Sequence, residues 1–391
     1  MSETASAAEP QPDSVLQLAD RLFQVGRGEA PVESLVAAVE HDGALPFWEA
    51  SVAAGRVSAA VQSEVWETLS RDAIEQRNRE ERRALTEKIA DARLHHGESE
   101  VREALVARSE YLARIGDVEQ AVRSYEAALR ATVGAGQRID IYLAQIRLGL
   151  AMQDYRLVRR AMSLAREHIE RGGDWERRNR FRVYEAVFVM TARRDLSGAA
   201  DRLLDSLATF TATELMPLSR FIFYTVVCSL ATKERPLLRD RVAKAPEVLQ
   251  VILQYPPLAT CLRGFVNCAY LDISRSLPGV LMLVRRDRLL HMHERYIARE
   301  IRVAAYAQYL VAYKSVTLAS MAAAFGVGAE FLDEELSRFI AAERLHAKID
   351  RVAGVIQTTR SDTRSARYHQ IIRDGDALLN RIQKLSRVID V

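Results

Sequence analysis

The residues of this sequence best suited to chemistry are two histidines separated by one residue, His291 and His293. Two imidazoles at this spacing begin a zinc-dependent isopeptidase motif, which continues with a serine and with an aspartate that completes the metal ligands. The corresponding positions, eight and eleven residues after His293, hold Ile301 and Ala304. A zinc ion bound here would lack its aspartate ligand, and the oxyanion formed during hydrolysis would lack the serine that orients it. We therefore expect His291 and His293 to be packing or surface histidines.

Other reactive constellations are also missing from the sequence. It contains no GxxxxGKS or GxxxxGKT, GxSxG or HExxH segment, and therefore no signature of phosphate binding, serine hydrolysis or zinc proteolysis. Cys228, Cys261 and Cys268 form no CxxC pair. Cys261 and Cys268 are seven residues apart, so we expect them on one face of a helix as packing residues. The sequence predicts no catalytic residue, no bound metal and no cofactor.

The composition favours a soluble, mostly helical protein. The chain has 391 residues, 49% of them apolar, which suits two or three packed units. Glycine (18) and proline (10) make up about 7% of the chain, against roughly 12% in average usage. The longest apolar run, residues 221–231, is shorter than the ~20 residues of a membrane span. With a net charge of +3 and three cysteines, we expect a reducing compartment, no membrane partner and no nucleic-acid partner.

The first 100 residues fall into two parts of different composition. Residues 1–14 are small, acidic and proline-containing, which predicts a disordered tail. Residues 15–100 have the pattern of N-terminal helices, and residues 61–93 within them predict one long charged helix. Ile74, Leu85 and Ile89 are its sparse apolar points.

A repeat follows over residues 101–215. Asp117, Asp154 and Asp195 are separated by 37 and 41 residues, and each is followed by apolar and small residues at helical spacing. This is the spacing of a tetratricopeptide-like (TPR-like) hairpin, in which the aspartate caps the second helix. Three such hairpins stack into a solenoid, whose extended surface binds protein more often than it carries out chemistry.

Residues 216–308 predict further helices, and residues 309–360 predict a winged helix. A short helix over residues 317–326 is followed by an amphipathic helix over residues 329–345. A β-hairpin over residues 346–359 then turns at Gly354. The apolar residues of the amphipathic helix are Phe331, Leu332, Leu336, Phe339 and Ile340, and those of the hairpin are Ala347, Ile349 and Val355.

Residues 361–391 predict a C-terminal helix with an apolar stripe that recurs every seven residues. Burying each of its side chains would contribute on the order of 1.5–3 kcal/mol before ordering costs. Since little chain remains to cover this stripe, we expect it to bind a partner. The stripe consists of Ile371, Leu378, Ile382, Leu385 and Ile389. Ile349 and Val355 of the hairpin are the other predicted partner-binding residues, because strand edges can be augmented.

Two charge patterns bear on nucleic-acid binding. The helix over residues 329–345 carries five acidic residues and two arginines, so it would repel the phosphates that a winged helix contacts in DNA. The richest basic cluster lies on a repeat helix and consists of Arg177, Arg178, Arg180 and Arg182. An RNA-binding winged-helix protein that uses this cluster remains an alternative, although a salt-bridging face for an acidic protein neighbour is favoured.

The order of these parts, helical repeats, a winged helix and a terminal helix, resembles the PCI-domain proteins of the proteasome lid, the signalosome and a translation initiation complex. Four stretches resemble a PCI-domain lid subunit of the 19S regulatory particle of the proteasome most closely. They are GESEVREALVARSEYLARIGDVEQA (97–121), GGDWERRNRFRVYEAVF (172–188), AFGVGAEFLDEELSRFIAAERLHAKID (324–350) and LLNRIQKLSRVIDV (378–391).

This resemblance implies a mostly α protein in which a TPR-like solenoid precedes a winged-helix (PCI) module and a C-terminal bundle helix. It implies a non-catalytic scaffold subunit that supports ATP-dependent degradation of ubiquitinated proteins in the cytoplasm and nucleus. The implied partners are other PCI-domain lid subunits, the lid deubiquitylase with its MPN-domain partner, and the base ATPases as further candidates. The large PCI subunit of the signalosome shares the architecture and remains an alternative.

Overall fold

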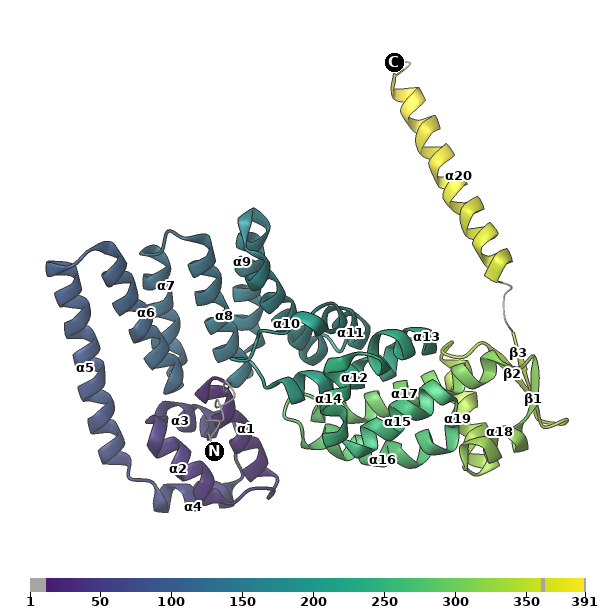
Figure 1. The fold of residues 1–391 in the computed structure, drawn as a ribbon, viewed down its shortest axis with the longest axis horizontal. Coiled ribbons are helices and arrows are strands. Elements are labelled where there is room, and N and C mark those ends of the chain that lie inside the picture. The colour runs from purple at the N-terminus through teal and green to yellow at the C-terminus, as the bar shows by residue number, and fades with distance from the viewer. Residues whose placement is uncertain (1–11, 360–362, 390–391) are drawn as a thin grey trace, which may run out of the picture.

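The structure is a computed structural model that describes residues 12–359 and 363–389. In Figure 1 helices packed side by side lead into a second group of helices, a small sheet and a last helix, α20, that projects from the rest. The predicted mostly helical fold, with a repeat region, a winged helix and a terminal helix, is confirmed. Residues 1–11 of the predicted tail lie outside the described residues. Its last residues are structured, because Ser14 begins α1.

Five helices form the N-terminal part, and the predicted single charged helix over residues 61–93 is wrong. They are α1 (Ser14–Gly26), α2 (Val32–Asp42), α3 (Leu45–Ala53), α4 (Ala59–Thr68) and α5 (Arg71–His95). The chain turns between α4 and α5 because Leu69 buries its side chain from an extended backbone conformation. The carboxylate of Glu40 accepts a hydrogen bond of 3.1 Å from the Ser70 N–H at the same turn.

Three helical hairpins follow, and the predicted caps are confirmed. The hairpins are α6 (Glu98–Arg114) with α7 (Val118–Arg130), α8 (Ala135–Ala151) with α9 (Tyr155–Gly172), and α10 (Trp175–Ala192) with α11 (Leu196–Asp205). The Asp117, Asp154 and Asp195 side chains accept hydrogen bonds of 2.9–3.2 Å from backbone N–H groups in the first turns of α7, α9 and α11. Each carboxylate thus stabilises the start of the second helix of its hairpin.

The three hairpin turns also share a left-handed residue directly before the aspartate. Gly116, Gln153 and Arg194 have φ angles of +79°, +55° and +55°. Glycine adopts this conformation at no steric cost, so only the first of the three turns has a residue that favours it. In the first turn of each second helix, Ala121, Val158 and Ala199 are fully buried.

The solenoid continues into a second group of helices. They are α12 (Leu218–Thr232), α13 (Arg235–Leu237), α14 (Pro246–Val251), α15 (Pro256–Asn267), α16 (Tyr270–Arg286) and α17 (Glu294–Val311). Pro236, Pro246 and Pro256 occupy the first turns of α13, α14 and α15, where a missing N–H costs nothing. The apolar helix α12 packs against both α11 and α17, so it joins the solenoid to the helix that precedes the winged helix.

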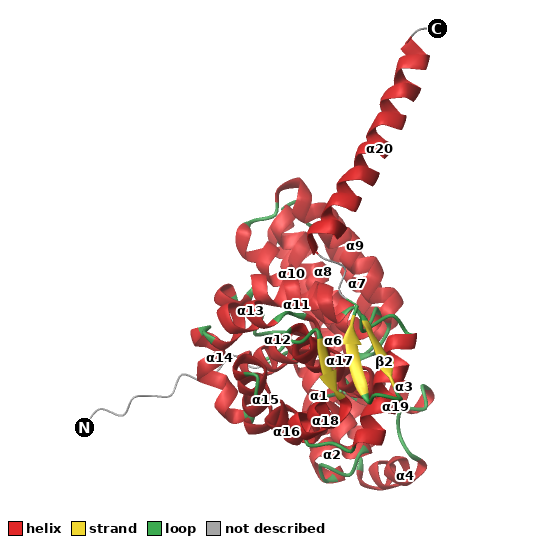
Figure 2. Cartoon of the chain, turned by 90° about the vertical axis from the view of Figure 1, so that its right-hand side faces the viewer, coloured by secondary structure: helices red, strands yellow, loops and turns green. Residues whose placement is uncertain are grey.

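The winged helix contains one strand more than the sequence predicted. Its elements are β1 (Ser315–Thr317), α18 (Leu318–Phe325), α19 (Ala329–Ala341), β2 (Ala347–Asp350) and β3 (Val355–Thr358). The antiparallel sheet has the order β1–β3–β2, and Figure 2 shows its three strands together. The three residues of β1 are too few for an alternating pattern, so periodicity could not reveal this strand.

The predicted apolar face of the second winged-helix helix needs a correction. α19 ends at Ala341, and Phe331 is exposed whereas Glu335 is buried. The Glu335 carboxylate accepts a hydrogen bond of 2.7 Å from the Tyr306 hydroxyl and lies 3.0 Å from the Arg302 guanidinium. This pairing makes the buried position acceptable for a charged residue.

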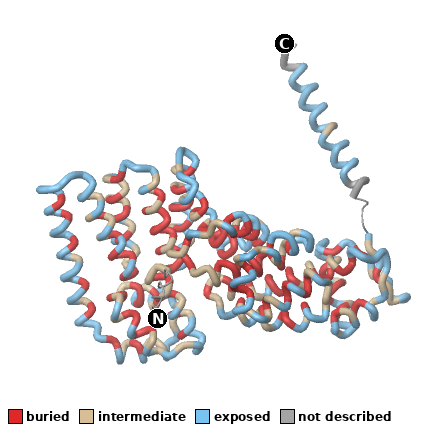
Figure 3. Tube along the Cα trace, viewed as in Figure 1, coloured by how far each residue is buried: buried red, intermediate tan, exposed pale blue. Residues whose placement is uncertain are grey.

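The last helix, α20 (Thr363–Ile389), makes up most of the predicted terminal segment. Figure 3 shows buried residues throughout the solenoid and the second group of helices, whereas the described part of α20 is exposed along nearly its whole length. The folded body therefore has its own core, and α20 has none.

One prediction concerns the cap of α9. Replacing Asp154 with alanine removes the acceptor of two N–H groups, and we expect the free energy of unfolding to fall by about 1 kcal/mol. Urea denaturation followed by circular dichroism measures the change. Asp154→Asn keeps a capping oxygen and should cost clearly less, whereas equal losses for both variants would contradict the capping role.

Candidate partner-binding surfaces

The predicted stripe on the terminal helix is an uncovered apolar surface. Ile371, Leu378, Ile382 and Leu385 are each between 53% and 66% exposed. Ile389 is the last residue of α20, and its side chain lies outside the described part of the structure. Because α20 turns once every 3.6 residues, the four described side chains lie on one side of the helix.

The apolar surface of α20 is wider than the sequence analysis found. Tyr368, Ile372 and Leu379 are as exposed as the stripe and lie beside it on the helix. Counting in steps of seven from Ile371 follows only one row of residues along the helix, so it misses the neighbouring row that holds these three side chains. A helical-wheel projection over the whole segment would have revealed both.

Seven large apolar side chains on one helix differ from ordinary surface residues. Monomeric proteins expose single apolar side chains freely, but a contiguous apolar surface usually marks an interaction site. Burying each of these side chains would contribute roughly 1.5–3 kcal/mol. We name this set the α20 apolar face. It consists of Tyr368, Ile371, Ile372, Leu378, Leu379, Ile382 and Leu385.

The winged-helix sheet separates the two other predicted partner-binding residues. Ile349 lies on β2, which is an edge strand, and pairs with Ile356 of β3. Val355 lies on β3 between Thr317 of β1 and Asp350 of β2. The prediction that both hairpin strands have open edges is therefore wrong for β3, because β1 occupies the second edge. Additional strands can join this sheet only beside β1 or β2.

The two histidines with apparent metal-binding spacing are engaged in packing. His293 is buried, and its Nε2 lies 2.8 Å from the carbonyl oxygen of Thr191. His291 lies with its Nδ1 2.8 Å from the carbonyl oxygen of Arg288 and its ring against Phe23. No three histidine, cysteine or acidic side chains within residues 12–359 and 363–389 are grouped to hold a metal ion.

Two of the three cysteines are poor nucleophiles. Burial raises the pKa of Cys228 and of Cys261 to about 12, so both thiols stay protonated near neutral pH. Cys268 is half-buried and ends α15 with a φ of +59°. It therefore lies outside the helical segment that holds Cys261, and the predicted shared helix face is wrong.

The basic cluster of α10 is partly neutralised within the chain. Arg177 lies 2.7 Å from Asp140 and also pairs with Asp174, and Arg180 lies 2.7 Å from Glu214. The hydrogen bond to Asp140 is the main cause of the raised pKa of Arg177. With these two side chains paired, the cluster offers less free positive charge to RNA than its four arginines alone suggest.

Of the described helices, none combines the length and apolarity needed to cross a bilayer.

Comparisons with known proteins agree with these observations. The family model for 26S proteasome subunit RPN7 matches residues 70–241, and the PCI domain model matches residues 283–360. A third model, the 26S proteasome regulatory subunit RPN7/PSMD6 C-terminal helix, matches residues 367–389. This third match covers the α20 apolar face.

Curated relatives extend the similarity over most of the chain. The 26S proteasome non-ATPase regulatory subunit 6 of Oryza sativa subsp. japonica is 44% identical over 359 residues, 91% of this chain and 90% of the relative. The homolog of that subunit in Arabidopsis thaliana is 46% identical over 80% of this chain and 81% of its own. The 26S proteasome regulatory subunit RPN7 of Saccharomyces cerevisiae is 36% identical over 75% of this chain and 69% of its own.

One prediction follows from the environments of the cysteines. In the native protein at pH 8, only the half-buried Cys268 should react with a chromogenic disulfide reagent, because Cys228 and Cys261 are buried and protonated. All three thiols should react after denaturation, which serves as the control. Rapid release of two or more equivalents from the native chain would contradict this assignment.

Proposed function

The chain belongs to the 26S proteasome subunit RPN7 family, and from this premise we propose that it is a non-catalytic scaffold subunit of the lid of the regulatory particle. In this role it supports the ATP-dependent degradation of ubiquitinated proteins by holding other subunits in place. The single observation that carries the proposal is the α20 apolar face, which no other described part of the chain covers.

The physical basis is the cost of leaving this face in water. An isolated helix gains little stability from its backbone alone, and most helical stability in proteins comes from packing an amphipathic face. Partner helices with complementary apolar faces would supply that packing in a helical bundle. We propose that α20 enters such a bundle and that the α20 apolar face is its contact surface.

The winged helix supplies a second surface for assembly. β2 and β1 have unpaired backbone groups on their outer edges, and an edge strand of a neighbouring subunit can pair with them. We propose that Ile349 lies at such a junction. Val355, on the central strand, contributes by supporting the sheet.

The absence of catalysis is part of the proposal. It is supported by the packing roles of His291 and His293 and by the protonated state of Cys228 and Cys261.

The proposed partners are other PCI-domain lid subunits, the lid deubiquitylase with its MPN-domain partner, and the base ATPases. The proposed location is the cytoplasm and nucleus.

A double variant of α20 tests the bundle. Leu378→Asp with Leu385→Asp places two charges on the α20 apolar face, and burying them would cost several kcal/mol. We expect the purified chain to keep its circular dichroism spectrum but to be lost from assembled lid. Native mass spectrometry of proteasomes purified from cells that carry the tagged variant measures the incorporation.

The matched control places two aspartates on the opposite side of the same helix, as Asn380→Asp with Lys384→Asp. This control should enter the lid like the wild-type chain. Normal incorporation of the Leu378→Asp, Leu385→Asp variant would refute the proposal that the α20 apolar face is the contact surface.

A further inference from the structure

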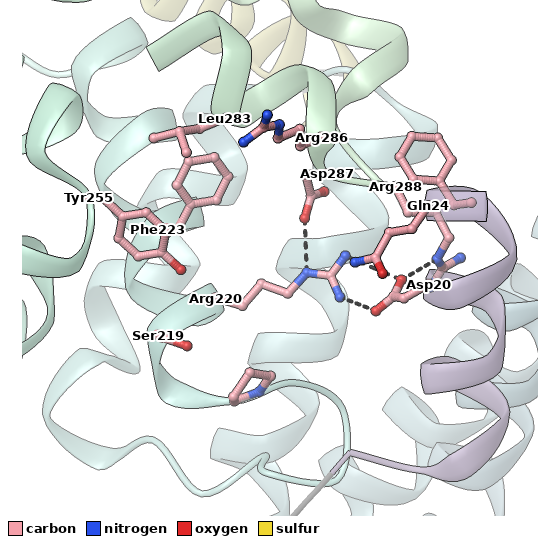
Figure 4. Close-up of a pocket in the computed structure, with 12 residues that line it drawn as sticks. Asp20, Gln24, Ser219, Arg220, Phe223, Tyr255, Leu283, Arg286, Asp287 and Arg288 are labelled. Carbon is pink, nitrogen blue, oxygen red and sulfur yellow. Dashed lines mark hydrogen bonds and ion pairs between the residues drawn. The ribbon is translucent and has the colours of Figure 1, made fainter. Parts of the chain in front are cut away.

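The side chain of Asp20, on α1, lies between two arginines from the far part of the chain. The Nε of Arg288 donates to Asp20 Oδ1 over 2.6 Å, and the guanidinium of Arg220 pairs with the other carboxylate oxygen. Figure 4 shows this arrangement at the edge of a cavity of about 330 Å³. These bonds join residues 268 and 200 positions apart in the sequence.

The two arginines are themselves held in place. Arg220 on α12 donates to Asp287 over 2.9 Å, and the hydroxyl of Tyr224 donates to the same carboxylate. Arg288 is only 4% exposed, and its Nη1 donates to the carbonyl oxygen of Leu150 at the end of α8 over 2.9 Å. Arg288 therefore connects α1, the second hairpin and the segment before α17.

The charge balance of this cluster depends on Asp20. Burial alone would raise the pKa of Asp20, but the positive charges of Arg220 and Arg288 outweigh burial and hold its pKa below the ordinary value. The carboxylate is thus ionised at neutral pH. Its removal would leave Arg288 buried without its only carboxylate partner among the described residues.

Both ends of α1 make further long-range contacts. Before its start, the Asp13 N–H donates to the carbonyl oxygen of Glu214 over 2.9 Å, and its carboxylate accepts from Arg147 over 2.8 Å. After its end, Arg27 donates to the carbonyl oxygen of Arg285 over 2.9 Å. One helix therefore touches the second hairpin, the segment after the third hairpin and the end of α16.

The residues in and after α3 make hydrogen bonds to the turns of the first two hairpins. The Phe47 N–H donates to the Ile115 carbonyl oxygen over 3.1 Å, and Arg56 donates to the Met152 carbonyl oxygen. A Cβ atom on Gly116 would lie 2.4 Å from the Cβ of Phe47, so the two backbones are in close contact.

These contacts limit how far the solenoid can bend. In a solenoid each hairpin contacts only its neighbours, so small rotations at successive interfaces add up to a large bend. Residues 13–56 connect the first hairpin, the second hairpin, α12 and the segment between α16 and α17, which are not all neighbours. In Figure 1 the helices α1–α3 lie below α6–α8 in the view, with α1 nearest the second group of helices.

We propose that α1–α3 form an internal brace that fixes the angle between the TPR-like solenoid and the winged-helix half of the chain, with Asp20 as its positioning residue. The brace sets where the winged helix lies relative to the hairpins. It acts within the single chain and does not depend on the proposed role in the lid.

Distance measurement between spin labels in the full-length chain tests the brace. Arg83→Cys on α5 and Glu334→Cys on α19 supply exposed labelling sites, in a Cys268→Ser background that leaves the buried thiols intact. With Asp20→Asn, double electron–electron resonance should give a shifted distance distribution roughly twice as wide as that of the parent chain, because a hinge motion is released.

Asp240→Asn is the matched control. Asp240 also pairs with two cations, Arg239 at 3.0 Å and Lys244 at 2.8 Å, but all three lie in one short segment. This variant should leave the distance distribution unchanged. A folded Asp20→Asn chain with the same narrow distribution as Asp240→Asn would overturn the proposal.

A second variant covers the case in which Asp20→Asn does not fold. Arg27→Ala with Glu29→Ala removes the contacts to Arg285 and Arg286 without leaving a buried charge. It should widen the distribution in the same direction, by less than Asp20→Asn. If this folded double variant keeps the parent distribution while Asp20→Asn is unfolded, the brace is equally refuted.

Discussion

The structure depends on one constraint: α20 is a long amphipathic helix whose apolar face is left uncovered by the described residues. The described residues of α1–α19 build a continuous core, and the α20 apolar face contributes nothing to it. In the proposed assembly the hydrophobic effect would act on α20 between molecules. Folding of the body and burial of α20 would then be separate events, and the second would require a partner.

In the proposed scaffold role, the remaining elements present this helix and the sheet edge. Aspartate caps and left-handed residues set the hairpin turns, and the hairpins stack into an extended array. Helix α12 packs against α11 and α17, so it continues the core from the solenoid to the helix that precedes the winged helix. The N-terminal contacts then join parts that stacking alone would leave free to bend, which gives residues 13–56 a role that their sequence did not suggest.

Much of the fold could be predicted from local signals in the sequence. The Asp117, Asp154 and Asp195 repeat predicted the hairpins, because capping involves residues close in sequence. The break at Leu69, strand β1 and buried Glu335 were missed, since each depends on a tertiary contact that periodicity does not encode. The sequence analysis found only one of the two rows of apolar residues on α20. The Asp20 cluster was not predicted, because it joins residues 200 and 268 positions apart.

Amide hydrogen exchange of α20 tests the central claim most directly. Peptides covering residues 367–389 should exchange within seconds in the free chain, where packing does not protect the helix, and at least about 100-fold more slowly in the assembled regulatory particle. Peptides from α8 and α12, which are buried in both states, provide the internal reference. Equal exchange of α20 in the free and assembled states would contradict the account.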